Sequence, residues 1–449
     1  MMLTMTRRWR SMILPLACTL VLTASTASAQ DPFNLAAPVH NLATLFTELY
    51  GPHGLIVDSL ATLPGEQPHT AHFNSSFQSD FSQFNTALVG QIVSVPLPSP
   101  ASGFTYRFDP SLGVFQRTTG SFGPILAERA ETIGAGRLAL GFAMQRFTYD
   151  TIEGLDLNTV PAVFTHDNAE LLGGRQDVIS TVNSISATVS QSTSFITYGI
   201  SNRFDISLAV PIVSVNLKVV SAATIHRLGT TNDLTHFFRQ ADGDVGDERS
   251  FTAAGSASGI GDVTVRLKTA LRRTESHGIA AGLDVRVPTG DAENLLGSGT
   301  TGLQPFAIWS STLGNVSPHA NVSYTWNGAS VLAGDPETGQ ATDFPDEFRY
   351  TVGTEVAMSQ RATLALELLG RTVIGSERLQ AKTFHALDGV STFPDITFSQ
   401  DTFNLLNGSM GVKVNLAGRF LAEANILFAL DDHGLRDRVT PLVGLQYTF

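Results

Sequence analysis

The chain has 449 residues with 28 basic and 40 acidic side chains, a formal net charge of −12, 15% charged and 43% apolar residues, and 40 glycines. The acidic balance argues against a nucleic-acid partner, because phosphate binding needs a basic face. So few charges, with so many small residues, also argue against one large soluble core and are typical of transmembrane barrels, whose strands carry an apolar lipid face and a polar inner face. A secreted β-sandwich is the alternative that composition leaves open.

Residues 1–29 read as a secretory signal peptide. A basic stretch from Arg7 to Arg10 precedes an apolar run from Met12 to Leu22, and Ala27-Ser28-Ala29 stands before Gln30. We expect cleavage between Ala29 and Gln30. The apolar run is shorter than the ~20 residues of a spanning helix. The only cysteine, Cys18, lies within this segment, so the mature chain would have no disulfide; lipoprotein cleavage at Cys18 is the alternative.

The next region, Gln30 to about Pro124, alternates poorly. It contains one helix-like piece, Leu42 to Tyr50, with Leu42, Leu45, Phe46 and Leu49 on one face. We therefore divide the chain into a signal peptide (1–29), an N-terminal plug or periplasmic segment (30–124) and an outer-membrane barrel (125–449). The alternative for the middle part is a loosely ordered leader.

From Arg137 onward the chain alternates between apolar and polar residues with a period of two, as strands do. The first such strand runs to about Tyr149. The clearest one places Ala320, Val322, Tyr324 and Trp326 on one face and Asn321, Ser323 and Thr325 on the other. The last strand ends in Tyr447-Thr448-Phe449, a terminal aromatic pattern that we interpret as a C-terminal signal for the barrel-assembly machinery, carried by Tyr447 and Phe449.

Short and long links between these strands alternate strictly. The five short links lie near Asn202, Glu275, Asn315, Gln360 and Gly418. Long polar segments at 150–177, 221–258, 291–299, 329–345, 375–400 and 431–436 separate them. Tight periplasmic turns and longer extracellular loops give a transmembrane barrel this rhythm. The sequence thus predicts an all-β, antiparallel transmembrane barrel of about twelve strands between 136 and 449, or about fourteen if residues 88–118 add a hairpin.

Four motifs carry a family resemblance. Ser258-Gly259-Ile260-Gly261-Asp262-Val263 opens one strand, Val287-Pro288-Thr289-Gly290-Asp291 closes the next, and Gly297-Ser298-Gly299-Thr300 opens a third. Together with Ser317-Pro318-His319-Ala320-Asn321-Val322-Ser323-Tyr324, they resemble the phenol-degradation meta-pathway family of outer-membrane proteins, relatives of the long-chain fatty-acid transporter barrels. The resemblance covers about residues 120–449. It implies a monomeric barrel through which small, often hydrophobic molecules cross the outer membrane, and it names no single molecule.

The same motifs have a structural reading. Glycine permits unusual backbone angles, aspartate caps free amides, and proline is tolerated where a strand ladder ends. We favour this rim role over direct ligand binding.

Charged residues on the polar face of the strands are candidates for lining the lumen. A mixed lining either forms a closed network of ion pairs, which we favour, or defines a polar path around a plug. The candidates are Asp262, Arg266, Lys268, Asp284, Arg286, Arg349, Glu355, Glu367, Arg371, Lys413 and Glu423.

Pro211 interrupts a strand, and beyond it the apolar phase slips from Ile206 and Leu208 to Val213 and Val215. A proline with a phase slip predicts a bulge or kink. In barrels that resemble the fatty-acid transporters, a kinked strand opens a lateral exit, so Pro211 is the candidate for such a gap; a harmless rim bulge is the alternative.

Two acidic segments suggest other functions less strongly. Asp242, Asp244, Asp247 and Glu248 crowd one loop without the spacing of a calcium site, so we expect a solvated loop. Asp431-Asp432-His433 is the only hint of a barrel enzyme of protease or lipase type. A structural or adhesive barrel is the third class.

The interpretation is a channel in the outer membrane of a Gram-negative bacterium for passive uptake of small hydrophobic or aromatic compounds. Such transport needs a path and a gradient, and we expect no enzyme activity, cofactor or metal. The expected partners are the outer-membrane bilayer, the assembly machinery and small hydrophobic solutes.

Overall fold

The structure is a computed structural model that describes residues 41–51, 54–60, 71–75, 77, 83–95, 106–109, 114–117, 120–166, 177–229, 234–240, 243–274 and 276–449. The chain divides into two units, residues 1–34 and 35–449, and every described residue belongs to the second. The predicted cleavage between Ala29 and Gln30 lies outside the described residues, as does Asp242.

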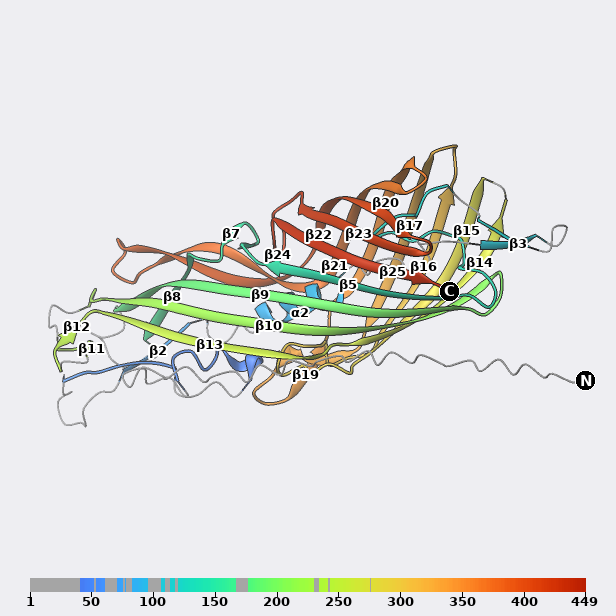
Figure 1. Cartoon of the computed structure of the whole chain (residues 1–449). Helices are drawn as coiled ribbons and strands as arrows, with labels where there is room; N and C mark the ends of the chain where they lie inside the picture. Colours follow the sequence, from blue (N-terminus) through green and yellow to red (C-terminus); the bar gives the residue numbers. More distant parts are fainter. Residues whose placement is uncertain are drawn as a thin grey trace, which may run out of the picture. The chain divides into compact units, whose positions relative to one another are not determined.

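Twelve antiparallel strands close into one barrel (Figure 1). Each pairs with its neighbours in chain order, and β25 returns to pair with β5. The strands are β5 (Leu138–Thr148), β9 (Val178–Gly199), β10 (Phe204–His226), β14 (Val263–Arg273), β15 (His277–Val287), β16 (Gly302–Ser311), β17 (Val316–Asn327), β20 (Asp346–Ser359), β21 (Ala362–His385), β22 (Thr392–Ala417), β23 (Phe420–Ala429) and β25 (Val439–Thr448). The predicted all-β barrel is confirmed, with twelve strands.

The five short links fall where the sequence predicts them, all at one end of the barrel, which we call the short-turn end. Both chain ends of the barrel, Leu138 and Phe449, meet there, and the Phe449 N–H donates to the Leu138 carbonyl at 2.7 Å. The first barrel strand begins at Leu138, one residue after the predicted start at Arg137, and residues 125–137 precede it.

The outer wall of the barrel is apolar. On one strand after another, large apolar side chains in the outward phase are exposed, among them Phe142, Ile206, Leu283, Val352 and Leu445. Exposed apolar side chains all round a closed barrel are what a lipid-facing wall requires. Among the described residues, no helix is long and apolar enough to cross a membrane.

Two hairpins rise far beyond the barrel wall at the opposite, long-loop end (Figure 1). Strands β9 and β10 stay paired from Asp205↔Gly199 to His226↔Val178. Above the barrel, β10 pairs with β13 (Glu248–Ile260) and β9 pairs with β8 (Val160–His166). Strands β21 and β22 likewise stay paired up to His385↔Thr392. The predicted loops at 150–177, 221–258 and 375–400 are therefore partly strands.

The bulge or kink predicted in β10 at Pro211 is not found, although the apolar phase does change there. The β9–β10 register is unbroken through Pro211↔Thr193. What changes along β10 is the surroundings of its two faces. On the barrel wall, the outward side chains Ile206 and Ile212 are exposed. Further toward the long-loop end, the inward side chain of Val215 is completely buried.

On its other side, β10 changes partner at Pro211, from β14 (Ala209↔Thr264) to β13 (Ile212↔Ile260). The missing proline N–H falls at this junction, where a ladder bond is not needed. The Gly261 N–H donates to the Pro211 carbonyl at 2.9 Å, so hydrogen bonding to β10 continues across this change of partner. The lateral exit at Pro211 stays a prediction.

Segments from the N-terminal region pack inside the barrel, toward its long-loop end. The predicted helix over 42–50 is a 3₁₀ helix, η1 (Leu42–Thr44), continued by turns. Part of the alternative hairpin over 88–118 is instead a helix, α2 (Gln83–Val93), and β3 (Tyr106–Asp109) pairs only with β4 (Val114–Arg117) among the described strands. A fourteen-stranded barrel is therefore excluded.

Nine further short strands of the described chain lie outside the barrel wall. They are β1 (Leu55–Val57), β2 (Ala71–Asn74), β6 (Thr151–Ile152), β7 (Leu155–Asp156), β11 (Phe238–Arg239), β12 (Val245–Gly246), β18 (Ala329–Asp335), β19 (Gln340–Asp343) and β24 (Leu435–Arg436).

One hydrophobic core joins these segments to the risen hairpins. Phe46 packs edge-on against Phe84 of α2, with ring centroids 5.3 Å apart, and the same cluster includes Val215 and Val219 of β10. The buried Tyr50 hydroxyl lies 2.8 Å from the Ser221 hydroxyl, and burial raises the pKa of Tyr50 well above its ordinary value, so the phenol stays neutral. The inner faces of the two hairpins thus pack against η1 and α2 and cover them.

Candidate functional site in the barrel lumen

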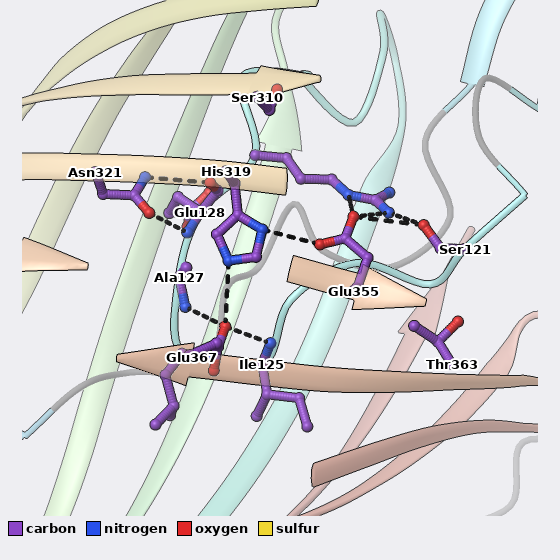
Figure 2. A network of polar contacts seen from close by, with 12 residues as sticks. Ser121, Ile125, Ala127, Glu128, Ser310, His319, Asn321, Glu355, Thr363 and Glu367 are labelled. Atoms are coloured by element: carbon purple, nitrogen blue, oxygen red, sulfur yellow. Dashed lines mark hydrogen bonds and ion pairs between the residues drawn. The ribbon is translucent and has the colours of Figure 1, made fainter. Parts of the chain in front are cut away.

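Residues 120–136, which we call the strap, cross the barrel lumen near its short-turn end before the chain enters β5. The strap lacks regular secondary structure, so its amides need partners from the wall. Glu367 of β21 accepts hydrogen bonds from the backbone N–H groups of Ile125, Leu126 and Ala127 at 2.9–3.2 Å (Figure 2). Three amides converging on one buried carboxylate fix the strap across the lumen.

A buried ion pair anchors the strap a few residues further on. Arg129 donates from Nε to Oε1 of Glu355 on β20 at 2.9 Å, and both side chains are at most 2% exposed. The His319 ring of β17 lies between two carboxylates, with Nδ1 3.0 Å from Glu355 and Nε2 3.8 Å from Glu367 (Figure 2). Buried charges are tolerated only when paired, so these four side chains must be considered as one unit.

The strap is tied to the opposite wall as well. Glu128 pairs with Arg266 at 2.7 Å and with Lys268 at 3.2 Å, both on β14. Closer to β5, the Ile133 N–H donates to Asp205 of β10 at 3.0 Å. The strap therefore bridges β10, β14, β20 and β21 across the lumen.

Glycines on the inner wall make room for the strap. A Cβ at Gly411 would lie 2.5 Å from the Ile125 side chain, and one at Gly278 would lie 2.8 Å from the Ala130 Cβ. Inward glycines in a strand indicate a close neighbour.

A cavity of about 200 Å³ lies between α2 and the strap, and we call it the chamber. Val93 and Val95 line it from the helix side, and Leu126, Ala127 and Glu128 line it from the strap. The barrel wall adds an apolar surface and a polar one. The apolar wall residues include Phe147, Phe306, Ile308, Leu369 and Leu427, and the polar ones include Arg266, Asp284, Gln304, Arg349 and Arg371.

All eleven predicted lumen residues are buried or partly buried on barrel strands or at their rim. Most are paired within the lumen. The ion pairs are Arg266 with Asp284 (2.7 Å), Arg286 with Asp262 (3.6 Å), Lys413 with Glu423 (3.2 Å), Lys268 with Glu128, Glu355 with Arg129, and Arg349 and Arg371 with Glu347 (2.6 and 3.5 Å). Glu367 binds the strap amides. The arrangement is a paired network around an occupied lumen.

The sequence family described as "Putative MetA-pathway of phenol degradation" matches residues 162–391 of this chain. The chain belongs to this family. The match spans most of the barrel wall and ends before the last strands, and the strap precedes it. No curated protein matches the chain in sequence.

The chain is also similar to solved structures of outer-membrane proteins. An outer membrane channel from Pseudomonas putida F1 is 13% identical, with 71% of this chain and 98% of that chain covered and a TM-score of 0.44. A FadL homologue from Pseudomonas aeruginosa is 8% identical over 70% of this chain and 90% of that one, with a TM-score of 0.30. The likeness concerns the fold alone.

Within the family match, three of the motifs behind the resemblance meet at one rim. Asp262 accepts from the Gly290 N–H (3.1 Å) and from the Ser298 N–H (2.8 Å), and the Thr289 hydroxyl donates to the Gly261 carbonyl (2.7 Å). These bonds confirm the structural role of the motifs as turn and cap chemistry.

Two wall residues and the strap are not among the predicted site residues. His319 shares the inward phase of Asn321, and Glu347 shares that of Arg349, so extending the alternation by one step would have found both. Glu128 and Arg129 had no such signal, because the strap has no period.

Asp431 and His433, in the segment considered for enzyme activity, contact different partners. The Asp431 carboxylate pairs with Arg436 and accepts from the Leu406 N–H, whereas His433 Nδ1 lies 3.7 Å from Glu153. Across the described part of the chain, no group of three or more His, Cys, Asp or Glu side chains could hold a metal ion.

Proposed function

We propose that the protein is an outer-membrane channel for passive entry of small hydrophobic or aromatic compounds. The chamber is the observation that supports this proposal. It lies inside a lipid-facing barrel, midway between two internal obstructions, and it combines aromatic and aliphatic walls with a few polar groups, which is the composition of small-molecule sites.

The size of the chamber suits a single-ring compound. A dry engineered cavity of roughly 150 Å³ accommodates benzene. The chamber, at about 200 Å³, is therefore large enough for one substituted ring and too small for a sugar chain.

A second, smaller cavity of about 40 Å³ extends the route toward the long-loop end. It lies along α2 beside Gly90, and it shares Gln91 and Arg371 with the chamber. Solute would enter along this face of the helix, occupy the chamber, and leave when the strap yields at the short-turn end. In this proposal the strap acts as the gate of the channel.

Filling the chamber tests the proposal. Ser323 faces the chamber from β17, so Ser323→Trp places a large ring inside it. We expect uptake of radiolabelled benzamide by porin-depleted cells to fall close to the rate of cells without the protein. Val412→Trp, on the lipid-facing wall, is the matched control and should leave uptake unchanged. Equal uptake through the wild type and Ser323→Trp would contradict the proposal.

A further inference from the structure

Two arginines face each other inside the barrel. Arg349 of β20 and Arg371 of β21 are direct cross-strand partners, and both line the chamber. Like charges directly opposite each other on neighbouring strands are destabilising. An arrangement that costs stability in a lumen where other charges are paired requires a compensating group.

Within the described part of the chain, the carboxylate that pairs with them is Glu347. It lies 2.6 Å from Arg349 and 3.5 Å from Arg371, and it also accepts from the Ser94 hydroxyl at 2.8 Å. One negative charge therefore serves two positive charges. Five other described cations of the lumen each have a carboxylate of their own close by: Arg129 with Glu355, Arg266 with Asp284, Lys268 with Glu128, Arg286 with Asp262, and Lys413 with Glu423. The positive excess is local to Arg349 and Arg371.

Part of the Arg371 guanidinium is available to a ligand. Its Nη1 donates to the Gly90 carbonyl of α2 at 3.1 Å and pairs with Glu347. Among the described residues, no group accepts a hydrogen bond from its Nε or Nη2. The side chain is 14% exposed and lines both the chamber and the smaller cavity. Guanidinium groups bind carboxylates with two parallel hydrogen bonds, which needs two free nitrogens.

An apolar surface adjoins this charge. Leu369 lies two residues before Arg371 on the same face of β21, and Phe306 and Ile308 line the same chamber from β16. A ring held by these side chains can present an attached anionic oxygen to Arg371.

We propose that the chamber binds small aromatic anions, with the ring on the apolar wall and a carboxylate or phenolate oxygen at Arg371 and Arg349. This inference rests on the proposed function, because it specifies which solutes the channel accepts. The bound anion supplies the charge that Glu347 alone cannot, so it also removes the repulsion between the two arginines.

Equilibrium dialysis of detergent-solubilised protein against benzoate and against benzamide tests this without requiring transport. The two probes have nearly the same shape and differ in charge. We expect benzoate to bind about tenfold more tightly than benzamide, which is the effect of one hydrogen bond to a charged group. Arg371→Gln should remove this preference and leave benzamide binding as it is. Glu347→Gln, which enlarges the positive excess, should strengthen benzoate binding.

Arg361→Gln provides the matched control, since it makes the same charge change in an exposed turn and should retain the preference. Equal binding of the two probes by the wild type, or equal losses for both in Arg371→Gln, would overturn the inference. Uptake in porin-depleted cells separates it from the proposed function. Uptake of both probes without a preference overturns only the inference, whereas benzoate binding without uptake of either probe overturns only the channel function.

Discussion

Replacing Arg129 with methionine is expected to destabilise the closed position of the strap by about 3–5 kcal/mol, because breaking a buried ion pair leaves an uncompensated charge. That charge is Glu355, which is 1% exposed and lies beside His319 and close to the strap. The barrel wall has its own continuous ladder of backbone bonds and should persist. The strap should therefore leave its place while the barrel remains folded.

Planar-bilayer recordings measure this directly. Arg129→Met should show a higher single-channel conductance and more frequent open events than the wild type, because the strap crosses the lumen near the short-turn end. The double variant Arg129→Met/Glu355→Leu removes both charges and should return the conductance toward that of the wild type, since apolar replacement of a whole buried pair is often neutral. Arg361→Met, in an exposed turn, controls for the loss of one positive charge. An unchanged conductance in Arg129→Met would show that the strap does not limit passage.

The barrel could be predicted from the sequence because its signal is local. Each strand alternates by itself, each short link breaks the alternation, and the count of twelve follows from adding them. The risen hairpins could not be predicted in this way. Along β10 the backbone phase never changes, yet the apolar side switches from the outward Ile206 to the inward Val215. Alternation reports which face is apolar, and only the surroundings decide whether that face meets lipid or a core.

The strap marks the other limit of prediction. Its position depends on Glu367, Glu355 and Arg266, which lie more than a hundred residues away in sequence, and on backbone amides that any residue supplies. The wall residues were predictable as inward charges. Their partners were not, because a segment without regular structure leaves no periodic pattern.

Exchanging Val215 for aspartate is expected to unfold the β9–β10 hairpin above the barrel. Val215 is completely buried against the core formed with η1 and α2, so the new carboxylate would lose its water without gaining a partner. The cost should be about 3–5 kcal/mol, as for other uncompensated buried charges. Asn216→Asp, one residue further along, places the same group on the exposed outer face and should change stability by no more than about 0.5 kcal/mol.

Trypsin cleavage after Lys218 reports the outcome, because Lys218 lies in the same strand and is cut only when the hairpin opens. With intact cells, we expect rapid cleavage in Val215→Asp and slow cleavage in both the wild type and Asn216→Asp. Faster cleavage in Asn216→Asp than in Val215→Asp would contradict this prediction. It would mean that the inward face of β10 is exposed to water and does not cover the core around η1 and α2. Because α2 also supplies one wall of the chamber, Val215→Asp should weaken benzamide uptake too, although Val215 lies outside the chamber. The hairpin would then serve the channel by holding α2 in place.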